Sequence, residues 1–206
     1  MKILFQGDSI TDARRPRDIE GYLGCGYATM VAGVLGLEEP NKYEFINRGI
    51  SGNRVVDVYA RIKPDIINLK PDVMSILIGV NDVWHDLLEN PMGASADKYF
   101  KVYCMLIEDV LEALPNIKIM IFEPFVLEGF ETAEKIDYFR EEVSKRAQMA
   151  KKVAERYNLP FIPLQEKFNE LLKLAPSEYW LRDGVHPTAM GHEVIKNEWL
   201  KAFKKL

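Results

Sequence analysis

The sequence has few of the side chains that bind metals or form disulfides: of its 206 residues, two are cysteines and three are histidines. Cys25 and Cys104 lie far apart and match neither a metal-binding nor a redox spacing, so we expect free thiols. A metallophosphoesterase would need Asp-x-His and Gly-Asn-His-Asp/Glu strings, and only fragments of these occur. We therefore predict neither a metal nor any other cofactor.

Strong charge of one sign and long hydrophobic runs are missing as well. Lys and Arg total 27 against 31 Asp and Glu, which leaves a net charge of -4. This mild acidic excess is unsuited to nucleic-acid backbones and anionic lipid surfaces, so neither is an expected partner. No apolar stretch approaches the roughly 20 residues that cross a bilayer. Gln6-Gly7-Asp8 ends the first apolar run too early for a signal peptide, and we expect a cytoplasmic protein.

The composition that remains, 48% hydrophobic and 28% charged, is typical of a globular protein. Short apolar runs, each followed by Gly, Pro, Asn or Asp, read as buried strands. They are Ile3-Leu4-Phe5, Glu44-Phe45-Ile46, Val73 to Ile78, Ile117 to Phe122 and Phe161-Ile162. The last run is the weakest, because Pro160 and Pro163 bracket only two apolar residues.

Between these runs, apolar residues recur at helical spacing. One stripe runs from Val55 to Leu69, where Pro64 must kink or split the helix, and a longer one runs from Ile136 to Tyr157. Further helices are expected from about Ser95 to Leu114 and after Thr188, a plausible N-cap. The last helix should bury Val194, Ile195, Trp199 and Phe203.

Alternating strands and helices predict right-handed βαβ units. No linker, charge block or internal repeat interrupts the alternation. We therefore expect residues 1–206 to form one domain of the α/β class. It should be a three-layer α/β/α sandwich with a five-stranded parallel flavodoxin-like sheet.

Polar residues cluster directly after the predicted strands, at the edge of the sheet where such folds bind ligands. The segments are Gly7-Asp8-Ser9-Ile10, Gly49-Ile50-Ser51-Gly52-Asn53, Gly79-Val80-Asn81-Asp82, Glu123-Pro124-Phe125 and, later, Asp183-Gly184-Val185-His186. Ser, Gly, Asn, Asp and His at one edge are the residues that acyl transfer requires.

Four of these segments resemble, in order, the four blocks of the SGNH hydrolases, the GDSL-type esterases and lipases. The resemblance covers residues 3 to about 203. The strings Gly-Asp-Ser-Ile-Thr-Asp, Gly-Val-Asn-Asp-Val-Trp and Asp-Gly-Val-His-Pro-Thr are similar to those of intracellular carbohydrate acetylesterases, including acetylxylan esterases. The resemblance and the Phe/Trp-rich segments also point to a homo-oligomer of unspecified size.

The resemblance implies a catalytic triad of Ser9, Asp183 and His186. A serine hydroxyl becomes a nucleophile only beside a base, and His186 can supply that base while Asp183 orients its ring. A single serine after a strand is more often a turn residue or a helix cap, so the interpretation depends on all four blocks together. The Gly-x-Ser-x-Gly elbow of α/β-hydrolases is absent, which disfavours that fold.

An oxyanion hole is expected from the N–H groups of Ser9 and Gly52 and the side-chain amide of Asn81. Taken singly, Gly52 and Asn81 are more readily explained as turn residues, and only their joint occurrence favours the oxyanion hole. His192, within the last predicted helix, reads as structural. His85 follows Trp84 on a predicted long loop, where its role is open.

Three aromatic residues near the catalytic candidates, Trp84, Tyr179 and Trp180, are candidate sugar contacts, although each could instead be a core residue. The segment from Trp84 to Asp97 could alternatively cap an acyl pocket. We expect a serine esterase that removes small acyl groups, chiefly acetyl, from hydroxyls of soluble oligosaccharides or glycosides. The alternatives are a general short-chain esterase, thioesterase or lysophospholipase on the same triad and, from another class, a non-catalytic carbohydrate-binding domain.

Overall fold

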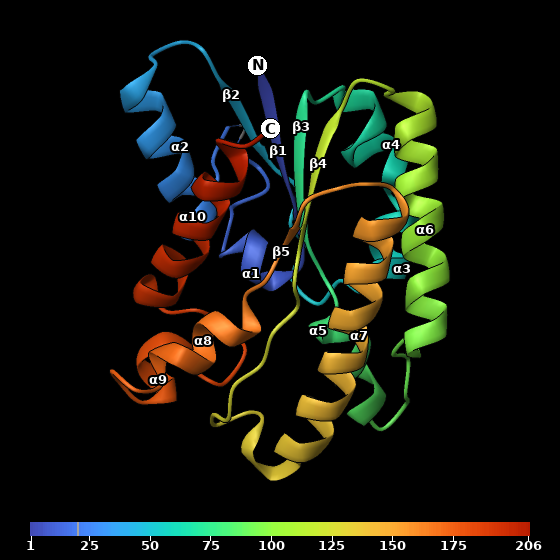
Figure 1. Cartoon of the computed structure of the whole chain (residues 1–206), viewed down its shortest axis with the longest axis vertical. Coiled ribbons are helices and arrows are strands. Elements are labelled where there is room, and N and C mark those ends of the chain that lie inside the picture. Colours follow the sequence, from blue (N-terminus) through green and yellow to red (C-terminus); the bar gives the residue numbers. More distant parts are fainter. Residues whose placement is uncertain (20) are drawn as a thin grey trace.

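The computed structural model describes residues 1–19 and 21–206, and in these residues five strands form one parallel sheet of order β2-β1-β3-β4-β5 (Figure 1). The strands are β1 (Lys2–Gly7), β2 (Glu44–Asn47), β3 (Val73–Leu77), β4 (Lys118–Phe122) and β5 (Phe161–Ile162). This order is the flavodoxin-like one, and it confirms the predicted fold class. Each predicted apolar run falls on one of these strands.

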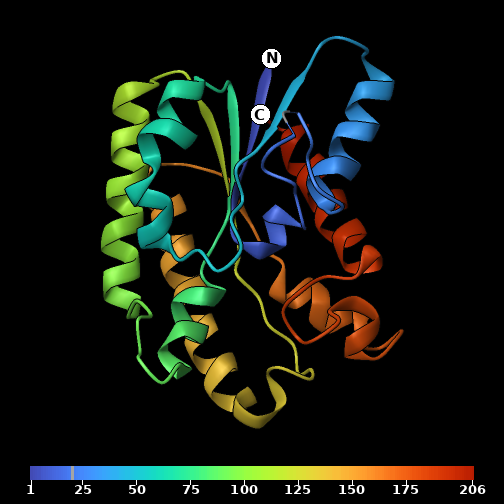
Figure 2. The same cartoon turned by 180° about the vertical axis from the view of Figure 1, so that it is seen from behind.

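Helices cover both faces of the sheet. The longer ones are α2 (Tyr27–Glu38), α6 (Ala96–Ala113), α7 (Ile136–Arg156) and α10 (Ala189–Phe203). The shorter ones are α1 (Ser9–Asp12), α3 (Val55–Ala60), α4 (Ile62–Asp65), α5 (Val80–Trp84), α8 (Gln165–Leu171) and α9 (Ser177–Trp180), with 3₁₀ turns η1 (Ile67–Leu69), η2 (His85–Leu87) and η3 (Ala133–Lys135). Figure 2 shows the same two helical layers from behind.

Side chains of β1 alternate between two hydrophobic cores. Ile3 and Phe5 belong to the core beneath α2, α8 and α10, whereas Leu4 belongs to the core beneath α3 and α6. The long helix α7 contributes to both cores. Burial on both faces explains why the strands read as continuous apolar runs and not as alternating ones.

The helix that Pro64 was expected to kink or split is indeed split, although Pro64 itself lies within α4. The stripe from Val55 to Leu69 is divided into α3, α4 and η1, with the first break at Arg61. Thr188 caps α10 as expected, because its hydroxyl accepts a hydrogen bond from the Gly191 amide at 3.3 Å. Within α10, Ile195 and Trp199 are fully buried, and Val194 and Phe203 pack partly buried against the same core.

The segment after β3 differs from the sequence interpretation, which placed His85 on a long loop. Residues 80–87 instead form α5 and η2. Four of the five α5 residues, those at positions 80–83, are buried, so tertiary packing stabilises a helix too short to form alone. None of the helices in the described parts of the chain is both long and apolar enough to span a membrane.

Candidate active site

Ser9 lies just beyond the end of β1, where a short helix begins. β1 ends at Gly7, Asp8 is the N-cap of α1, and Ser9 is the first residue of that helix. The Asp8 carboxylate accepts a hydrogen bond from the Ile10 amide at 2.9 Å. Burial of this carboxyl group raises its pKa to about 7. The cap fixes the backbone on both sides of Ser9.

A chain of hydrogen bonds connects Ser9 to His186 and Asp183. Ser9 Oγ lies 2.9 Å from His186 Nε2, and His186 Nδ1 lies 2.8 Å from Asp183 Oδ2. Asp183 Oδ1 accepts from the amides of Val185 (3.0 Å) and His186 (2.8 Å). Burial alone would raise the pKa of Asp183, but the hydrogen bonds from His186 and Val185 hold it below its usual value. Asp183 is therefore ionised where it meets the imidazole.

The turn that carries Asp183 and His186 is held by the segment following β4. The amides of Leu127 and Glu131 donate to the carbonyls of Gly184 (2.9 Å) and Asp183 (3.0 Å). Gly184 has φ 97°, and a Cβ there would lie 2.3 Å from the Thr132 hydroxyl. Only glycine suits both this backbone angle and this close approach.

The expected oxyanion residues lie on two neighbouring segments. Gly52 has φ 82°, while a Cβ at this position would meet no atom within 4 Å. Its backbone angle, and not lack of space, therefore requires glycine. Asn81 is buried on α5, and its amide nitrogen donates to the Asn53 carbonyl at 3.1 Å. This bond holds Asn81 beside the Gly52 segment and leaves its second amide N–H for another acceptor.

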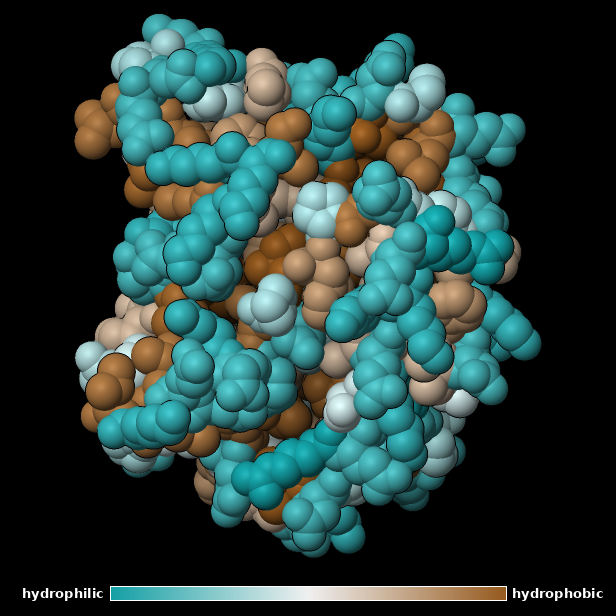
Figure 3. Space-filling model, in the orientation of Figure 1, coloured by the Kyte–Doolittle hydropathy of each residue, from teal (hydrophilic) through white to brown (hydrophobic). Residues whose placement is uncertain are grey.

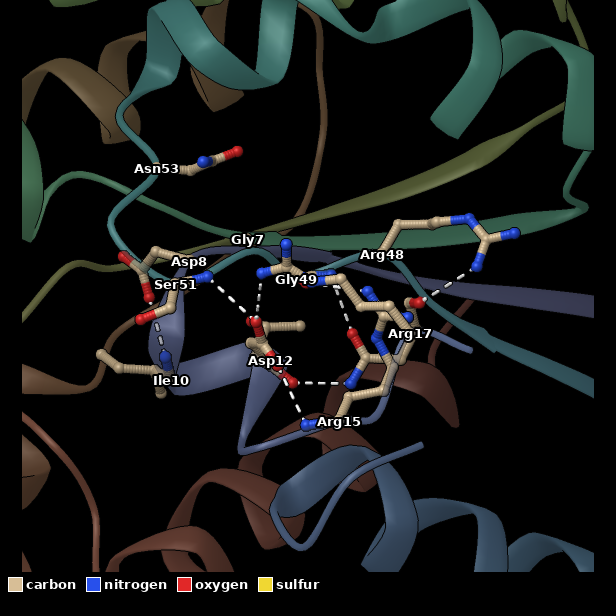
Figure 4. Close-up of polar contacts among 12 residues, drawn as sticks. Gly7, Asp8, Ile10, Asp12, Arg15, Arg17, Arg48, Gly49, Ser51 and Asn53 are labelled. Carbon is tan, nitrogen blue, oxygen red and sulfur yellow. Dashed lines mark hydrogen bonds and ion pairs between the residues drawn. The ribbon is translucent and has the colours of Figure 1, made fainter. Parts of the chain in front are cut away.

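Asp12 is a residue of this site that the sequence reading did not single out. Its carboxylate accepts from the amides of Ser51 and Arg15, both at 3.0 Å, and from Arg17 Nη2 at 3.3 Å, as Figure 4 shows. Asp12 therefore joins the helix of Ser9 to the segment of Gly52. The sequence could have indicated Asp12 by its position, three residues after Ser9 on the same short helix.

A cleft of 540 Å³ opens beside Ser9 and His186. Its wall also includes Asp12, Ser51, Cys25, His192 and two arginines, Arg14 and Arg182. Cys25 is exposed and Cys104 is buried, and both are free thiols. A second cleft, of 340 Å³, lies between α7 and α8, where Figure 3 shows hydrophobic side chains in a hollow, and no predicted site residue lines it.

The aromatic candidates lie near the triad but do not line the cleft in the described part of the chain. The ring of Trp84 is 6.0 Å from that of His186 and packs edge-on against Phe139. Tyr179 is exposed on α9, and the Trp180 indole donates to the Ala175 carbonyl at 3.2 Å. Their role as sugar contacts stays a prediction.

The remaining histidines differ in environment. His192 is buried, and its Nδ1 accepts from the Tyr27 amide at 3.2 Å, which agrees with a structural role. Burial lowers its pKa to about 4. His85 is half-buried, and burial and the nearby Arg54 lower its pKa. Residues 1–19 and 21–206 contain no group of three or more His, Cys, Asp or Glu side chains placed to hold a metal ion.

The chain resembles proteins that span nearly its whole length. An acetylxylan esterase of Geobacillus stearothermophilus is 37% identical, over 97% of this chain and 92% of the relative. A Parabacteroides merdae protein described as a GDSL-like lipase superposes with a TM-score of 0.92 at 37% identity, over 98% of this chain and 95% of that one. The structure of an acetylxylan esterase from G. stearothermophilus superposes with a TM-score of 0.86 at 34% identity, over 98% and 93%.

Solved variants of the Geobacillus enzyme identify some of its own residues. Three are described as catalytic mutants, in which a serine, an aspartate or a histidine is replaced by alanine. In that enzyme the aspartate precedes the histidine by three positions. Another variant replaces the tryptophan directly before that aspartate.

The match to a family model extends over most of the chain. The model of the GDSL-like lipase/acylhydrolase family matches residues 5–194, from the first strand to the last helix. This range contains the Ser9, Gly52 and Asn81 segments and the turn from Asp183 to His186. Together with the relatives above, it shows that the chain belongs to the GDSL-like lipase/acylhydrolase family and is a carboxylic ester hydrolase.

Proposed function

We propose that this protein is a serine esterase that removes acetyl groups from hydroxyls of oligosaccharides or glycosides, with Ser9, His186 and Asp183 as its catalytic triad. The observation that carries the proposal is the unbroken hydrogen-bond chain from Ser9 Oγ through the imidazole to Asp183. An ionised, hydrogen-bonded Asp183 fixes the tautomer in which Nδ1 carries the proton and Nε2 is free to accept one.

In the first half of the reaction, His186 Nε2 accepts the Ser9 proton while Ser9 Oγ forms a bond to the acetyl carbonyl carbon. The carbonyl electron pair moves to the oxygen, which the N–H groups of Ser9, Gly52 and Asn81 stabilise. One such donor contributes roughly 3 kcal/mol to lowering the barrier. The ester bond to the sugar oxygen then breaks, and the imidazolium returns its proton to that oxygen, releasing the sugar hydroxyl.

In the second half, water repeats the sequence on the acetyl-enzyme. His186 takes a proton from the water, whose oxygen attacks the acetyl carbonyl. The intermediate collapses with transfer of a proton back to Ser9 Oγ, and acetate leaves. Protons and covalent bonds pass only between the ester, water and the triad side chains, while the oxyanion donors stabilise the charge in both halves.

Two features of the relatives support the choice of residues and of substrate class. The catalytic aspartate and histidine of the Geobacillus enzyme have the same three-residue spacing as Asp183 and His186. That enzyme is an acetylxylan esterase and resembles this chain over nearly its full length. Acetylated xylo-oligosaccharides are therefore the first substrates to test.

The test compares wild type with Ser9→Ala on p-nitrophenyl acetate, acetylated xylo- and manno-oligosaccharides, acyl-CoA and lysophospholipid. Ser9→Ala should fold normally and lose about 10³-fold or more in kcat. A phosphonate probe should label wild type at Ser9 and leave the variant unlabelled.

Full activity in Ser9→Ala would overturn the mechanism. Turnover of acyl-CoA or lysophospholipid in preference to every acetylated saccharide would keep the triad but change the substrate class. Binding of saccharides without turnover of any ester would favour a carbohydrate-binding domain.

A further inference from the structure

The cleft beside Ser9 is positively charged although the chain as a whole is not. Its wall includes the side chains of Arg14 and Arg182, both exposed, in a protein with a net charge of -4. Among the described residues that line the cleft, the carboxylates number one, that of Asp12. The two guanidinium groups can bind a ligand only if they are not already paired with carboxylates of the protein.

Asp12 is unable to neutralise them. It is 5% exposed, and its oxygens already accept hydrogen bonds from Ser51, Arg15 and Arg17. Figure 4 shows these contacts converging on the Asp12 carboxylate. Their donors are the amides of Ser51 and Arg15 and the Arg17 guanidinium, and thus neither Arg14 nor Arg182. The Asp12 carboxylate is therefore part of the cleft wall, but its hydrogen bonds go to Ser51, Arg15 and Arg17.

The two arginines themselves retain free donors. Arg14 forms no ion pair within residues 1–19 and 21–206, and its backbone, at φ 60°, turns out of α1 in the left-handed region. Arg182 is 61% exposed and contacts Asp183 Oδ2 through one nitrogen at 3.3 Å. Because a guanidinium carries five N–H donors, most of those on Arg182 stay available.

The same position carries a different side chain in the related acetylxylan esterase. There a tryptophan directly precedes the catalytic aspartate, whereas Arg182 directly precedes Asp183 here. An aromatic ring is replaced by a cation next to the triad. A guanidinium is suited to a carboxylate or phosphate, with which it forms paired N–H···O bonds that a tryptophan cannot form.

We infer that the preferred substrates are acetylated saccharides that carry an anionic group, namely the carboxylate of a uronic acid residue, bound by Arg14 and Arg182. The inference rests on the proposed esterase function and specifies its substrate class. A phosphate group shares the same chemistry, so the test includes both anions.

The experiment measures kcat/KM for three acetylated substrates: a neutral xylo-oligosaccharide, the same oligosaccharide bearing a uronic acid, and a sugar phosphate. In wild type, kcat/KM for the uronic acid substrate should exceed that for the neutral one by about five-fold or more. The ratio should fall several-fold in Arg14→Gln and in Arg182→Gln. Arg182→Lys keeps the positive charge and should therefore retain part of the preference for the uronic acid substrate. Added salt should lower the ratio.

Arg156→Gln is the matched control. Arg156 is similarly exposed on α7, outside the cleft, so its loss removes the same charge from the chain and should leave the ratio at the wild-type value. An equal fall in this control would mean that overall charge, and not the cleft arginines, sets the preference, and would overturn the inference.

Two further outcomes overturn the inference while the proposed function stands, provided that acetylated saccharides are hydrolysed. One is a wild-type ratio of one or less. The other is a ratio that is unchanged in both Arg14→Gln and Arg182→Gln. A preference for the phosphate substrate over the uronic acid one would overturn the choice of carboxylate. Loss of the esterase proposal would instead appear as no turnover of any acetylated saccharide.

Binding provides a readout that does not require turnover. Calorimetric titration of Ser9→Ala should show tighter binding of the uronic acid substrate than of the neutral one. The difference should shrink in Ser9→Ala combined with Arg14→Gln. Equal binding of the two substrates to Ser9→Ala would overturn the inference whatever the catalytic result.

Discussion

The two sides of the active site are held in different ways. Ser9 lies two residues after the end of β1, whose hydrogen bonds to β2 and β3 fix that strand within the sheet. His186 belongs to a turn outside the sheet, which is held by backbone contacts from the segment 127–131. The serine side therefore inherits its position from the core, whereas the histidine side depends on contacts between loops.

This difference predicts how substitutions on each side of the site should affect catalysis. Changes near Ser9 must disturb the chemistry through individual hydrogen bonds, because the strand itself is buried on both faces. Changes near His186 can move this proposed base by loosening the segment 127–131 that holds its turn. The following variants test each side and the packing between them.

The largest effect is expected from the histidine side itself, in Asp183→Asn. The amide cannot hold the imidazole in the required tautomer or stabilise its charged form, so kcat should fall by about 10³-fold or more. The measurement is kcat on p-nitrophenyl acetate, with circular dichroism to verify the fold. Asp137→Asn, on a fully exposed carboxylate, is the control. A loss below ten-fold would contradict the role of Asp183.

The next effect concerns His192 of α10, whose Nδ1 accepts a hydrogen bond from the Tyr27 amide of α2. The pKa of His192 is lowered to about 4, so below its unfolded value of about 6.5 the unfolded state takes up the proton first. Stability should therefore fall as the pH drops from about 6.5 to 4, by up to about 3 kcal/mol.

His192→Gln keeps an acceptor for the Tyr27 amide and removes the titrating group. Chemical denaturation at pH 7.5 and pH 4.5 should show that wild type loses more stability than the variant across this range. The difference between the two proteins cancels the other titrating groups, including Asp8, whose raised pKa acts in the opposite direction. Equal losses would show that His192 does not account for the acid sensitivity.

A smaller effect is expected from Thr132→Val, which weakens the segment that holds the turn of Asp183 and His186. The buried Thr132 hydroxyl donates to the Leu127 carbonyl at 2.7 Å and accepts from the Gly129 amide at 2.9 Å. Valine keeps the shape but leaves both partners unpaired, at a cost of about 2 kcal/mol in the free energy of unfolding. Because this segment contacts Asp183 and Gly184, kcat should fall as well. A stable variant with normal kcat would contradict the proposed dependence on loop contacts.

The smallest effect is expected from Asp12→Asn on the serine side. An amide has one acceptor oxygen, so the amides of Ser51 and Arg15 cannot both be satisfied. The neighbouring Gly52 donor should shift, and kcat should fall by about ten-fold with little change in KM, because this donor acts mainly in the transition state. Steady-state kinetics separate the two parameters. A rise in KM at constant kcat would place Asp12 in substrate binding instead.

The strands and the main helices could be predicted because each depends on a local pattern. Apolar runs ended by Gly or Asp marked the strands, Pro64 marked a helix break, and Thr188 marked the start of α10. The order of the sheet followed from βαβ handedness and from the known preference of such folds. Because ligands bind at one edge of these sheets, the grouping of the site segments followed too.

Other features could not be predicted because they depend on long-range contacts. In helix α5, the buried Asp82 accepts a hydrogen bond from the Val55 amide at 3.1 Å. No local sequence pattern indicates that these two residues pair. Asp12 acts on Ser51, 39 positions away. Arg14 and Arg182 look like ordinary surface charges until the fold places both on the wall of one cleft.

The separation of Ser9 and His186 by 177 positions has a consequence for synthesis. During synthesis the serine leaves the ribosome 177 residues before the histidine. The hydrogen bond between them can form only after two segments far apart in the sequence have docked. With His186 as the proposed base, chains that end before it should be inert in ester hydrolysis, however much of the sheet they contain.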